Sequence, residues 1–283
     1  MYNFHSHTNY CDGSAEPEVY VIEAIKQGFK SYGFSAHSPI PLPNNFALKE
    51  DTIRPYCNEI ERLKKKYKGQ IDIFLGMEAD FIHGLSTPFD NFRTQFHLDY
   101  IIGSVHIVKS PAGDTWFIDG PRRESYDNGL ERFFNNDIRL AVTSFYHQTN
   151  LMLQTERFEI IGHFDKITMH NQNRYFTSSE QWYRNLVLET IALIKEKGMV
   201  VEINSRGLYK KRSADFFPET FILKHLHNAK IPVMINSDAH APHEISLLRN
   251  EAVSALKNAG FKEQAVIGAG GVRMVGMEET VRL

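Results

Sequence analysis

The chain has few cysteines, little net charge and no long apolar run. Its 283 residues include only Cys11 and Cys57, which are too few for a disulfide framework and match no zinc motif. The formal net charge of -2 gives no general attraction to nucleic acid or to anionic membranes. No apolar stretch approaches the roughly 18 residues of a membrane span, and the opening residues do not resemble a signal peptide. We therefore expect a cytoplasmic protein without a membrane partner, and consider nucleic acid an unlikely ligand.

The chain also lacks the Gly-x-Gly-x-x-Gly and Walker sequences that open nucleotide-binding helices in doubly wound sheets. Instead, apolar, β-branched runs alternate with helical patterns along almost its whole length. After an opening strand, further strands are predicted at 31–36, 71–77, 98–105, 158–162, 199–204 and 231–235, and helices at 18–27, 51–69, 136–154, 178–198, 218–228 and 243–259. Such units predict a parallel sheet covered by helices. We interpret the α/β chain as a closed, distorted (β/α)7 barrel, TIM-like, with residues 1–283 forming a single domain.

Two segments do not follow this rhythm. Residues 107–127 carry prolines and glycines among charged and aromatic residues, and we predict a long loop over the active face. This loop could close over a substrate with Trp116 and Phe117, or it could simply cover the barrel rim. Residues 265–283 are rich in glycine, with short apolar runs, and the pattern assigns them no element.

Histidines and carboxylates recur where predicted strands end. His5 and His7 lie two residues apart, so a strand would place both imidazoles on one face. Asp12 lies on the next loop, and later strands end at His37, Glu78, His106, His163, Asp238 and His240. In a parallel barrel these ends open onto one face, where barrel enzymes keep their active sites. A structural role remains the expectation for histidines in helices or loops, namely His83, His97, His147, His170, His225 and His227.

The nine histidines and carboxylates at or just after the strand ends, from His5 to His240, are too many ligands for one ion. A tetrahedral zinc uses about four ligands. Two or three divalent ions that share a carboxylate would account for the set, and Glu78, in the middle of the order, is the candidate bridge. The nitrogen and oxygen ligands suit zinc, manganese or iron without choosing among them. Closely spaced ions are the usual apparatus for displacement at phosphorus, because they activate water and stabilise the leaving oxygen.

The same residues resemble the four motifs of the PHP (polymerase and histidinol phosphatase) superfamily. His5-Ser-His7 with Asp12, the lone His37, Glu78, His106, Gly162-His163 and Ser237-Asp238-Ala-His240 carry the resemblance over about residues 3 to 240. It implies a distorted (β/α)7 barrel with a trinuclear metal site. By this analogy the first ion would be held by His5, His7, Glu78 and Asp238, the second by Glu78, His106 and His163, and the third by Asp12, His37 and His240. Asp12 departs from the pattern, because many members have a histidine there.

Within the superfamily, Ala36-His37-Ser38-Pro39 and the run Glu202 to Lys210 resemble the histidinol-phosphate phosphatase branch. The resemblance implies a phosphoric monoester hydrolase that converts L-histidinol phosphate to histidinol and phosphate in histidine biosynthesis. The mechanistic hypothesis is attack by a metal-bridging hydroxide, with Glu78 as the bridge. Arg206, just past the sixth strand, would bind the phosphate dianion. Asp165 and His37 are candidates for protonating the leaving group, although Asp165 could instead orient His163.

Two other interpretations remain open. One is a PHP nuclease or nucleotide phosphatase, although the near-neutral charge argues against long polynucleotides as its substrate. The other is a non-catalytic regulatory module that keeps the fold without the ions, and the complete ligand set argues against it. The oligomeric state cannot be derived from the sequence.

Overall fold

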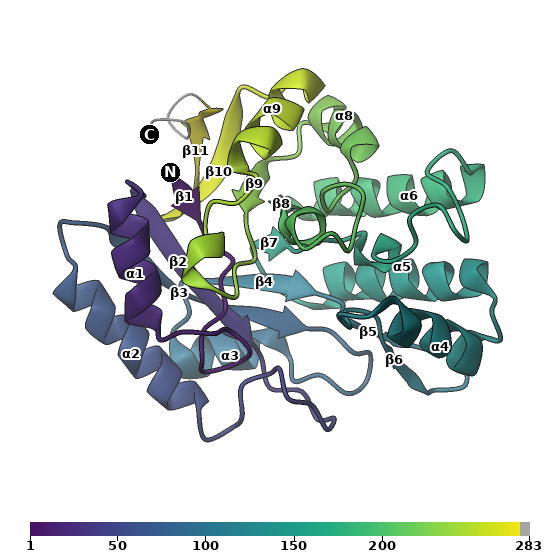
Figure 1. The fold of residues 1–283 in the computed structure, drawn as a ribbon, viewed down its shortest axis with the longest axis horizontal. Coiled ribbons are helices and arrows are strands. Elements are labelled where there is room, and N and C mark those ends of the chain that lie inside the picture. Colours follow the sequence, from purple (N-terminus) through teal and green to yellow (C-terminus); the bar gives the residue numbers. More distant parts are fainter. Residues whose placement is uncertain (278–283) are drawn as a thin grey trace.

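The computed structural model describes residues 1–277 and contains a nearly closed barrel of parallel strands (Figure 1). The strands follow the order β1 (Tyr2–Asn3), β2 (Ser31–His37), β3 (Asp72–Asp80), β4 (Tyr100–Ser104), β7 (Ile160–Ile161), β8 (Val200–Asn204) and β9 (Val233–Asn236). Every neighbouring pair in this order is parallel. The predicted distorted (β/α)7 barrel is confirmed.

The first and last strands meet where the barrel closes. Ser6 forms an isolated parallel bridge with Ala239, and the backbone N–H of His7 donates to the Ala239 carbonyl at 2.8 Å. The side chain of Asn236 accepts a hydrogen bond from the Phe4 N–H at 2.8 Å. These bonds bring the segment after β1 beside the segment after β9, although 232 positions separate Phe4 from Asn236. Both segments carry predicted metal ligands.

Helices follow the barrel strands, and most of them cover the outside of the barrel (Figure 1). They are α1 (Pro17–Lys26), α2 (Ile53–Lys66), α3 (Phe89–Phe96), α4 (Arg123–Phe134), α5 (Ile138–Thr155), α6 (Gln181–Lys197), α7 (Arg206–Tyr209), α8 (Thr220–Ala229) and α9 (Arg249–Ala259), with 3-10 turns η1 (Lys166–Thr168) and η2 (Pro242–Glu244). In α2 the predicted apolar stripe, which includes Ile53, Ile60 and Leu63, is buried, as the alternating spacing of three and four requires. Within the described residues, none of these helices combines the length and the apolar character that crossing a membrane demands.

The prediction of one long loop at 107–127 was wrong in its secondary structure. Strands β5 (Ile107–Lys109) and β6 (Thr115–Phe117) form an antiparallel hairpin there, and α4 begins at Arg123. Trp116 in β6 is 1% exposed and packs against Tyr126 and Phe134 of α4. Strands of three residues are too short to show a period of two, so a contact with a later helix, and not a local pattern, stabilises this hairpin. Helices α3 and α4 were not predicted.

A second hairpin closes the amino-terminal end of the barrel. Strands β10 (Glu263–Gly268) and β11 (Gly271–Gly276) pair antiparallel and account for most of the segment that the sequence left unassigned. Their apolar side chains join residues from the first half of the barrel strands in one buried cluster: Tyr2, Phe4, Tyr100, Ile102, Ile160, Val200, Met234, Ala265, Val266, Ile267 and Val275. The metal-ligand candidates therefore face the opposite, open end. Residues 278–283 lie outside the described part of the chain.

Tyr100 connects this interior cluster to the start of the site. Its hydroxyl donates to the Phe4 carbonyl at 2.6 Å, one residue before His5. Two glycines on neighbouring strands leave room for the ring, because a Cβ at Gly76 would lie 2.3 Å from Tyr100 Cζ and one at Gly33 would lie 2.4 Å from its hydroxyl. Small residues at these positions allow a buried tyrosine to hold the backbone that presents His5.

Candidate metal centre and active-site cavity

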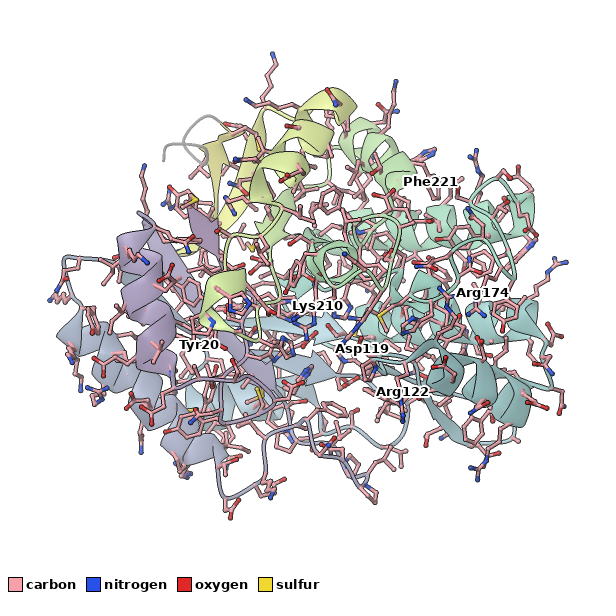
Figure 2. All side chains as sticks on the ribbon, viewed as in Figure 1. Tyr20, Asp119, Arg122, Arg174, Lys210 and Phe221 are labelled. Atoms are coloured by element: carbon pink, nitrogen blue, oxygen red, sulfur yellow. The ribbon has the colours of Figure 1, made fainter. Side chains whose placement is uncertain are left out.

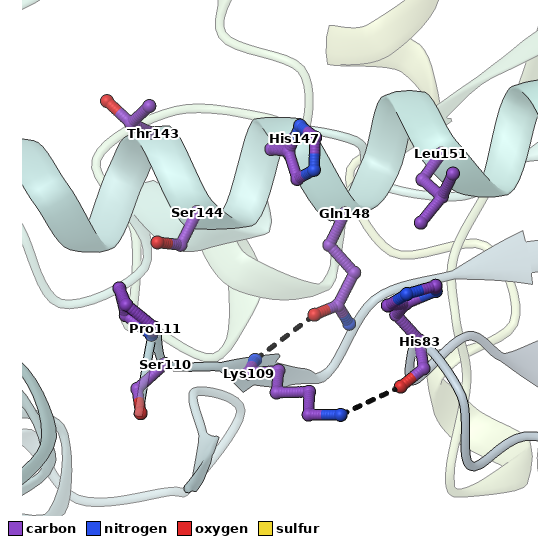
Figure 3. Close-up of a pocket in the computed structure, with 9 residues that line it drawn as sticks. All are labelled: His83, Lys109, Ser110, Pro111, Thr143, Ser144, His147, Gln148 and Leu151. Atoms are coloured by element: carbon purple, nitrogen blue, oxygen red, sulfur yellow. Dashed lines mark hydrogen bonds between the residues drawn. The ribbon is translucent and has the colours of Figure 1, made fainter. Parts of the chain in front are cut away.

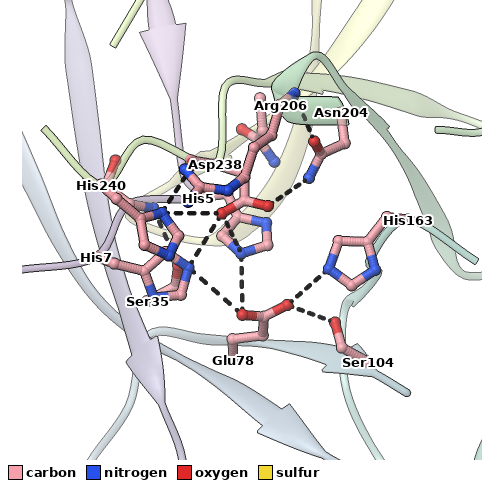
Figure 4. Close-up of polar contacts among 12 residues, drawn as sticks. His5, His7, Ser35, Glu78, Ser104, His163, Asn204, Arg206, Asp238 and His240 are labelled. Carbon is pink, nitrogen blue, oxygen red and sulfur yellow. Dashed lines mark hydrogen bonds and ion pairs between the residues drawn. The ribbon is translucent and has the colours of Figure 1, made fainter. Parts of the chain in front are cut away.

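The barrel brings all nine predicted ligand residues to its open end, and Figure 4 labels His5, His7, Glu78, His163, Asp238 and His240 among them. The side chains form four groups, and within each group the possible ligand atoms all lie within 4.8 Å of one another. The groups are His5-His7-Asp238, His5-Glu78-His163, His7-Asp12-His37-His240 and His37-Asp80-His106. Only Asp80 was not among the predicted ligands. Most of these side chains are buried, and Asp12, with 29% of its side chain exposed, lies at the solvent edge. The topology thus assembles residues from six strands into one centre.

Glu78 lies at the centre of this assembly. Its Oε2 is 3.2 Å from His5 Nε2 and 3.0 Å from His37 Nδ1, and it also faces His7 Nε2 at 3.4 Å. Its Oε1 faces His163 Nε2 at 3.0 Å and His106 Nε2 at 3.4 Å. One carboxylate therefore offers separate oxygens to two groups of imidazoles, as a carboxylate that bridges two ions does.

Two further carboxylates, Asp238 and Asp12, face the other imidazoles of the cluster. Asp238 Oδ1 lies 3.7 Å from His5 Nε2 and 3.3 Å from His7 Nε2. Asp12 Oδ2 lies 3.2 Å from His240 Nε2, and Asp12 Oδ1 lies 3.8 Å from His37 Nε2. The clusters overlap only in part with the sets that the superfamily resemblance implies, since His7 also groups with Asp12, His37 and His240, and His37 also groups with Asp80 and His106.

A layer of buried polar groups outside the cluster orients the imidazoles. Glu202 Oε1 lies 2.6 Å from His5 Nδ1, and Asp80 Oδ2 lies 2.9 Å from His106 Nδ1. With Nδ1 donating to a carboxylate, each ring directs the lone pair of Nε2 into the cluster. Asn204 and Asn236 donate to Glu202 in turn. The sequence pattern did not indicate this role for Glu202 or Asp80, although Asp80 follows Glu78 by two residues on the same strand face.

The electrostatics of the cluster fit divalent cations. Burial would raise the pKa of Glu78, yet the imidazoles of His5 and His106 hold that pKa well below its usual value. Burial would lower the pKa of His106, but the carboxylates of Asp80 and Glu78 raise it to about 9. Burial and the neighbouring imidazoles of His240 and His37 lower the pKa of His7. Ionised carboxylates packed against several imidazoles are the surroundings in which a cation can replace protons.

Unpaired buried atoms support the same conclusion. Within the described residues, buried side-chain atoms without a hydrogen-bond partner include His5 Nε2, His7 Nε2, His37 Nδ1 and Glu78 Oε2. Leaving a buried polar atom without a partner is costly, so native structures rarely do so without a reason. All four atoms point into the cluster, and all are nitrogen or oxygen atoms of the kind that coordinate zinc, manganese or iron. The residues present therefore fit a multinuclear metal site.

A cavity of about 270 Å³ adjoins this cluster. Its lining combines metal-ligand candidates, two arginines, two aromatic rings and a further carboxylate: Asp12, His37, Asn45, Phe46, His106, Phe117, Asp119, Pro121, Arg206, Arg212 and His240. The predicted Arg206 begins α7 and is held by a 3.0 Å hydrogen bond from Nη1 to the Asp238 carbonyl (Figure 4). A cationic side chain thus stands beside the ligand cluster, where a phosphate dianion would need it.

Asp165 takes a different position from the other predicted site residues. It is fully buried, but it does not border the cavity, and its Oδ2 accepts a hydrogen bond from the backbone N–H of Glu219 at 2.7 Å. Burial, with the nearby Glu219 carboxylate, raises its pKa well above the usual value. No contact joins its carboxylate to the ring of His163 among the described residues. Its assignment as a proton donor or as a partner of His163 remains a prediction without geometric support.

Asp119 and Lys166 belong to the site but were missed. Asp119 follows β6 and is labelled at the centre of the molecule in Figure 2. Its Oδ2 lies 3.8 Å from His106 Nε2, and its Oδ1 lies 3.1 Å from the ammonium of Lys166, which is 1% exposed. Burial would raise the pKa of Asp119, but Lys166 and His106 lower it. Asp119 lies in the predicted loop, so no strand-end pattern indicated that it belongs to the site. Lys166 follows His163 by three residues, which indicated only weakly that it lies near the site.

A separate hollow lies against α5, away from the ligand cluster (Figure 3). Its volume is about 310 Å³, and His83 and His147 are on its wall. Gln148 holds this region together by accepting from the Lys109 N–H and donating to the carbonyls of Phe81 and Ile107. Neither histidine joins a metal-ligand cluster of the described residues.

With this geometry established, the comparison with protein families decides the identity of the fold. The family model described as the PHP domain matches residues 3–206. The chain belongs to the PHP domain family. The predicted resemblance is confirmed, and the matched segment includes seven of the nine ligand candidates, all except Asp238 and His240.

Relatives of this PHP chain span nearly its full length. The histidinol-phosphatase of Bacillus subtilis is 27% identical over 256 residues, which cover 85% of this chain and 94% of the relative. A solved chain from Listeria monocytogenes has a TM-score of 0.77 at 20% identity and covers 89% of this chain and 99% of its own. The structure of histidinol phosphate phosphatase from Lactococcus lactis, complexed with zinc, L-histidinol and phosphate, has a TM-score of 0.67 at 20% identity, covering 96% and 98%. These two structures share the fold of the chain.

Proposed function

We propose that this PHP protein is a metal-dependent phosphoric monoester hydrolase that converts L-histidinol phosphate to histidinol and phosphate, a step of histidine biosynthesis. The observation that carries the proposal is the convergence of nine ligand candidates at one end of the barrel, beside a cavity that Arg206 lines together with Asp12, His37, His106 and His240. The relatives support the substrate, since the Bacillus subtilis protein is named histidinol-phosphatase and the Lactococcus lactis structure contains L-histidinol and phosphate. The cavity volume of about 270 Å³ suits a small molecule.

Three adjacent sites would hold the divalent ions, which are zinc, manganese or iron. His5, His7, Glu78 and Asp238 would hold the first, Glu78, His106 and His163 the second, and Asp12, His37 and His240 the third. Glu78 would belong to two sites, because its two oxygens face different imidazoles. When bound, such ions polarise phosphoryl oxygens, make water more acidic and stabilise a leaving oxygen. Zinc is present in the Lactococcus lactis structure.

The residues of the chain would bind and orient the ester. The guanidinium of Arg206 would pair with phosphate oxygens, and its bond to the Asp238 carbonyl keeps it beside the first site. Arg212 lines the same cavity and adds a second cation. Hydrolysis breaks the phosphorus–oxygen bond to the alcohol, whose oxygen must gain a proton. Of the two predicted proton donors, His37 lines the cavity but is also a ligand candidate for the third ion, and Asp165 does not border the cavity.

We also propose a cytoplasmic location. Cys11 and Cys57 are both unpaired, which suits a reducing compartment. The membrane and long polynucleotides are not proposed as partners, because the net charge of -2 favours neither.

A side-by-side assay tests the proposal. The purified chain is loaded separately with zinc, manganese and iron and offered histidinol phosphate, nucleoside bisphosphates and short oligonucleotides. We expect phosphate release from histidinol phosphate with the highest kcat/KM, and loss of that release after chelation. A higher kcat/KM on either nucleotide substrate would replace the proposal with the nuclease or nucleotide phosphatase alternative. Absence of turnover with every metal and substrate would favour a regulatory module.

A further inference from the structure

Two phenylalanine rings stand at the cavity outside the hydrophobic core. Phe46 lies on the segment between β2 and α2, and Phe117 ends β6. Their ring centroids are 5.1 Å apart with an interplanar angle of 17°, so the rings stack. Neither ring belongs to the core clusters that the described residues form, and 39% of Phe117 is exposed. Filling the core does not explain why two large apolar side chains are placed here.

The stacked pair adjoins the predicted metal centre. The ring of Phe46 lies 5.1 Å from the ring of His37, centroid to centroid, in an edge-to-face arrangement. Phe46 and Phe117 line the same cavity as His37, His106 and Arg206. The cavity therefore has cationic and metal-binding groups on one part of its wall and an aromatic surface on another. A phosphate ester whose phosphoryl group binds at the ligand cluster must direct its leaving group along the remaining wall.

A second hollow, of about 390 Å³, adjoins the other side of the pair. Its wall includes Phe46, Phe117 and the apolar residues Ile40, Leu42 and Ile107. The stacked pair therefore has a cavity on each of two sides. Its ring–ring contact joins the segment before α2 to the β5–β6 hairpin. Each ring consequently keeps a face or an edge that a flat ligand could contact.

We propose that Phe46 and Phe117 form the binding surface for the ring of an aromatic leaving group and so select aromatic phosphate esters over aliphatic ones. This inference rests on the proposed phosphomonoesterase function and adds the residues that determine specificity. The imidazole of histidinol is one such ring. Aromatic pairs prefer offset-stacked or edge-to-face contacts, and one such contact contributes roughly 10-fold in affinity. Because the rings touch the leaving group and not the phosphorus, they should affect substrate binding more than the chemical step.

The test compares a ring-bearing substrate with a ring-free one. Phe117→Ala and Phe46→Ala are assayed on histidinol phosphate and on 2-aminopropyl phosphate, which has the same amine and phosphate without the imidazole. We expect KM for histidinol phosphate to rise about 10-fold in each variant, with kcat and the kinetics of 2-aminopropyl phosphate nearly unchanged. Phe117→Tyr should retain the wild-type KM. Leu140→Ala, which removes a side chain that is 40% exposed on α5, is the matched control and should change neither substrate.

Equal changes for both substrates, or no change for either, would overturn the inference. Benzyl phosphate and propyl phosphate are measured in parallel, so that the aromatic surface is tested whatever the natural substrate is. If the wild type does not hydrolyse histidinol phosphate, the proposed function fails, and a benzyl preference that the alanine variants abolish still supports the surface. If the variants retain the benzyl preference, the surface is refuted. Should an alanine variant fail to fold, Phe117→Leu serves in its place.

Discussion

Glu202 Oε1 lies 2.6 Å from Nδ1 of His5, so a buried carboxylate on β8 holds an imidazole that follows β1. The other oxygen of Glu202 accepts the backbone N–H of His163 at 3.0 Å. One side chain therefore orients two metal-ligand candidates that lie 158 residues apart in the sequence, counted from position 5 to position 163. This arrangement makes Glu202 a sensitive test of how the centre is built.

Replacing Glu202 with glutamine should weaken metal binding without removing a ligand. The amide would lack the negative charge that fixes the tautomer and raises the basicity of His5, and losses of about 10- to 100-fold in metal affinity are typical of such changes. Metal affinity is measured by competition with a chromogenic chelator. Glu196→Gln, on the exposed side of α6, is the control. An affinity equal to that of the wild type would contradict the orienting role.

Replacing Glu78 with glutamine should affect two metal sites at once. Each oxygen of Glu78 faces a different pair or trio of imidazoles, and an amide offers only one good acceptor. We expect fewer bound ions per chain and a fall in kcat/KM of more than about 100-fold. Metal content by elemental analysis and phosphate release are measured on the same sample. Full metal content together with full activity would rule out the bridging role.

Removing the Arg206 guanidinium should weaken binding of the phosphoryl group. A hydrogen bond to a charged group contributes about 1.5–3 kcal/mol, so kcat/KM should fall roughly 10- to 100-fold in Arg206→Ala. Lysine at this position should restore part of the loss, since it keeps the charge without the two-pronged geometry. Arg122→Ala removes an exposed arginine and serves as the control. Unchanged KM and kcat in Arg206→Ala would refute phosphate binding by this residue.

Metal affinity should rise with pH up to about 9. In the metal-free protein the carboxylates of Asp80 and Glu78 raise the pKa of His106 to about 9 in spite of its burial. Below that pH the ring carries a proton that an ion must displace, so binding releases it; above that pH no such proton remains. The apparent affinity should increase by up to about tenfold per pH unit for each released proton, between pH 7 and 9. Constant affinity over this interval, measured by calorimetry in buffers of different ionisation heat, would contradict the assigned protonation.

Much of the fold follows from local patterns that the sequence displays directly. The apolar stripe of α2 and the β-branched runs of β8 and β9 are predicted correctly because their periods persist over enough residues. Strand β1 contains only Tyr2–Asn3, and an isolated bridge at Ser6 continues its pairing. The observed strand is therefore shorter than the alternating pattern predicted. The hairpin of β5 and β6 was missed because Trp116 is stabilised by α4, which follows later in the chain.

The sequence by itself determined the identity of the ligand candidates, because parallel strands place their carboxyl ends on one face and the same residue types recur at each end. Only the tertiary structure decided how those residues group. It showed Glu78 facing two sets of imidazoles, and Glu202 and Asp80 behind the rings. It also separated Asp165 from the cavity and brought Asp119 and Phe46 to it. Strand order and direction can be inferred from patterns, but distances between loops depend on packing that involves the whole chain.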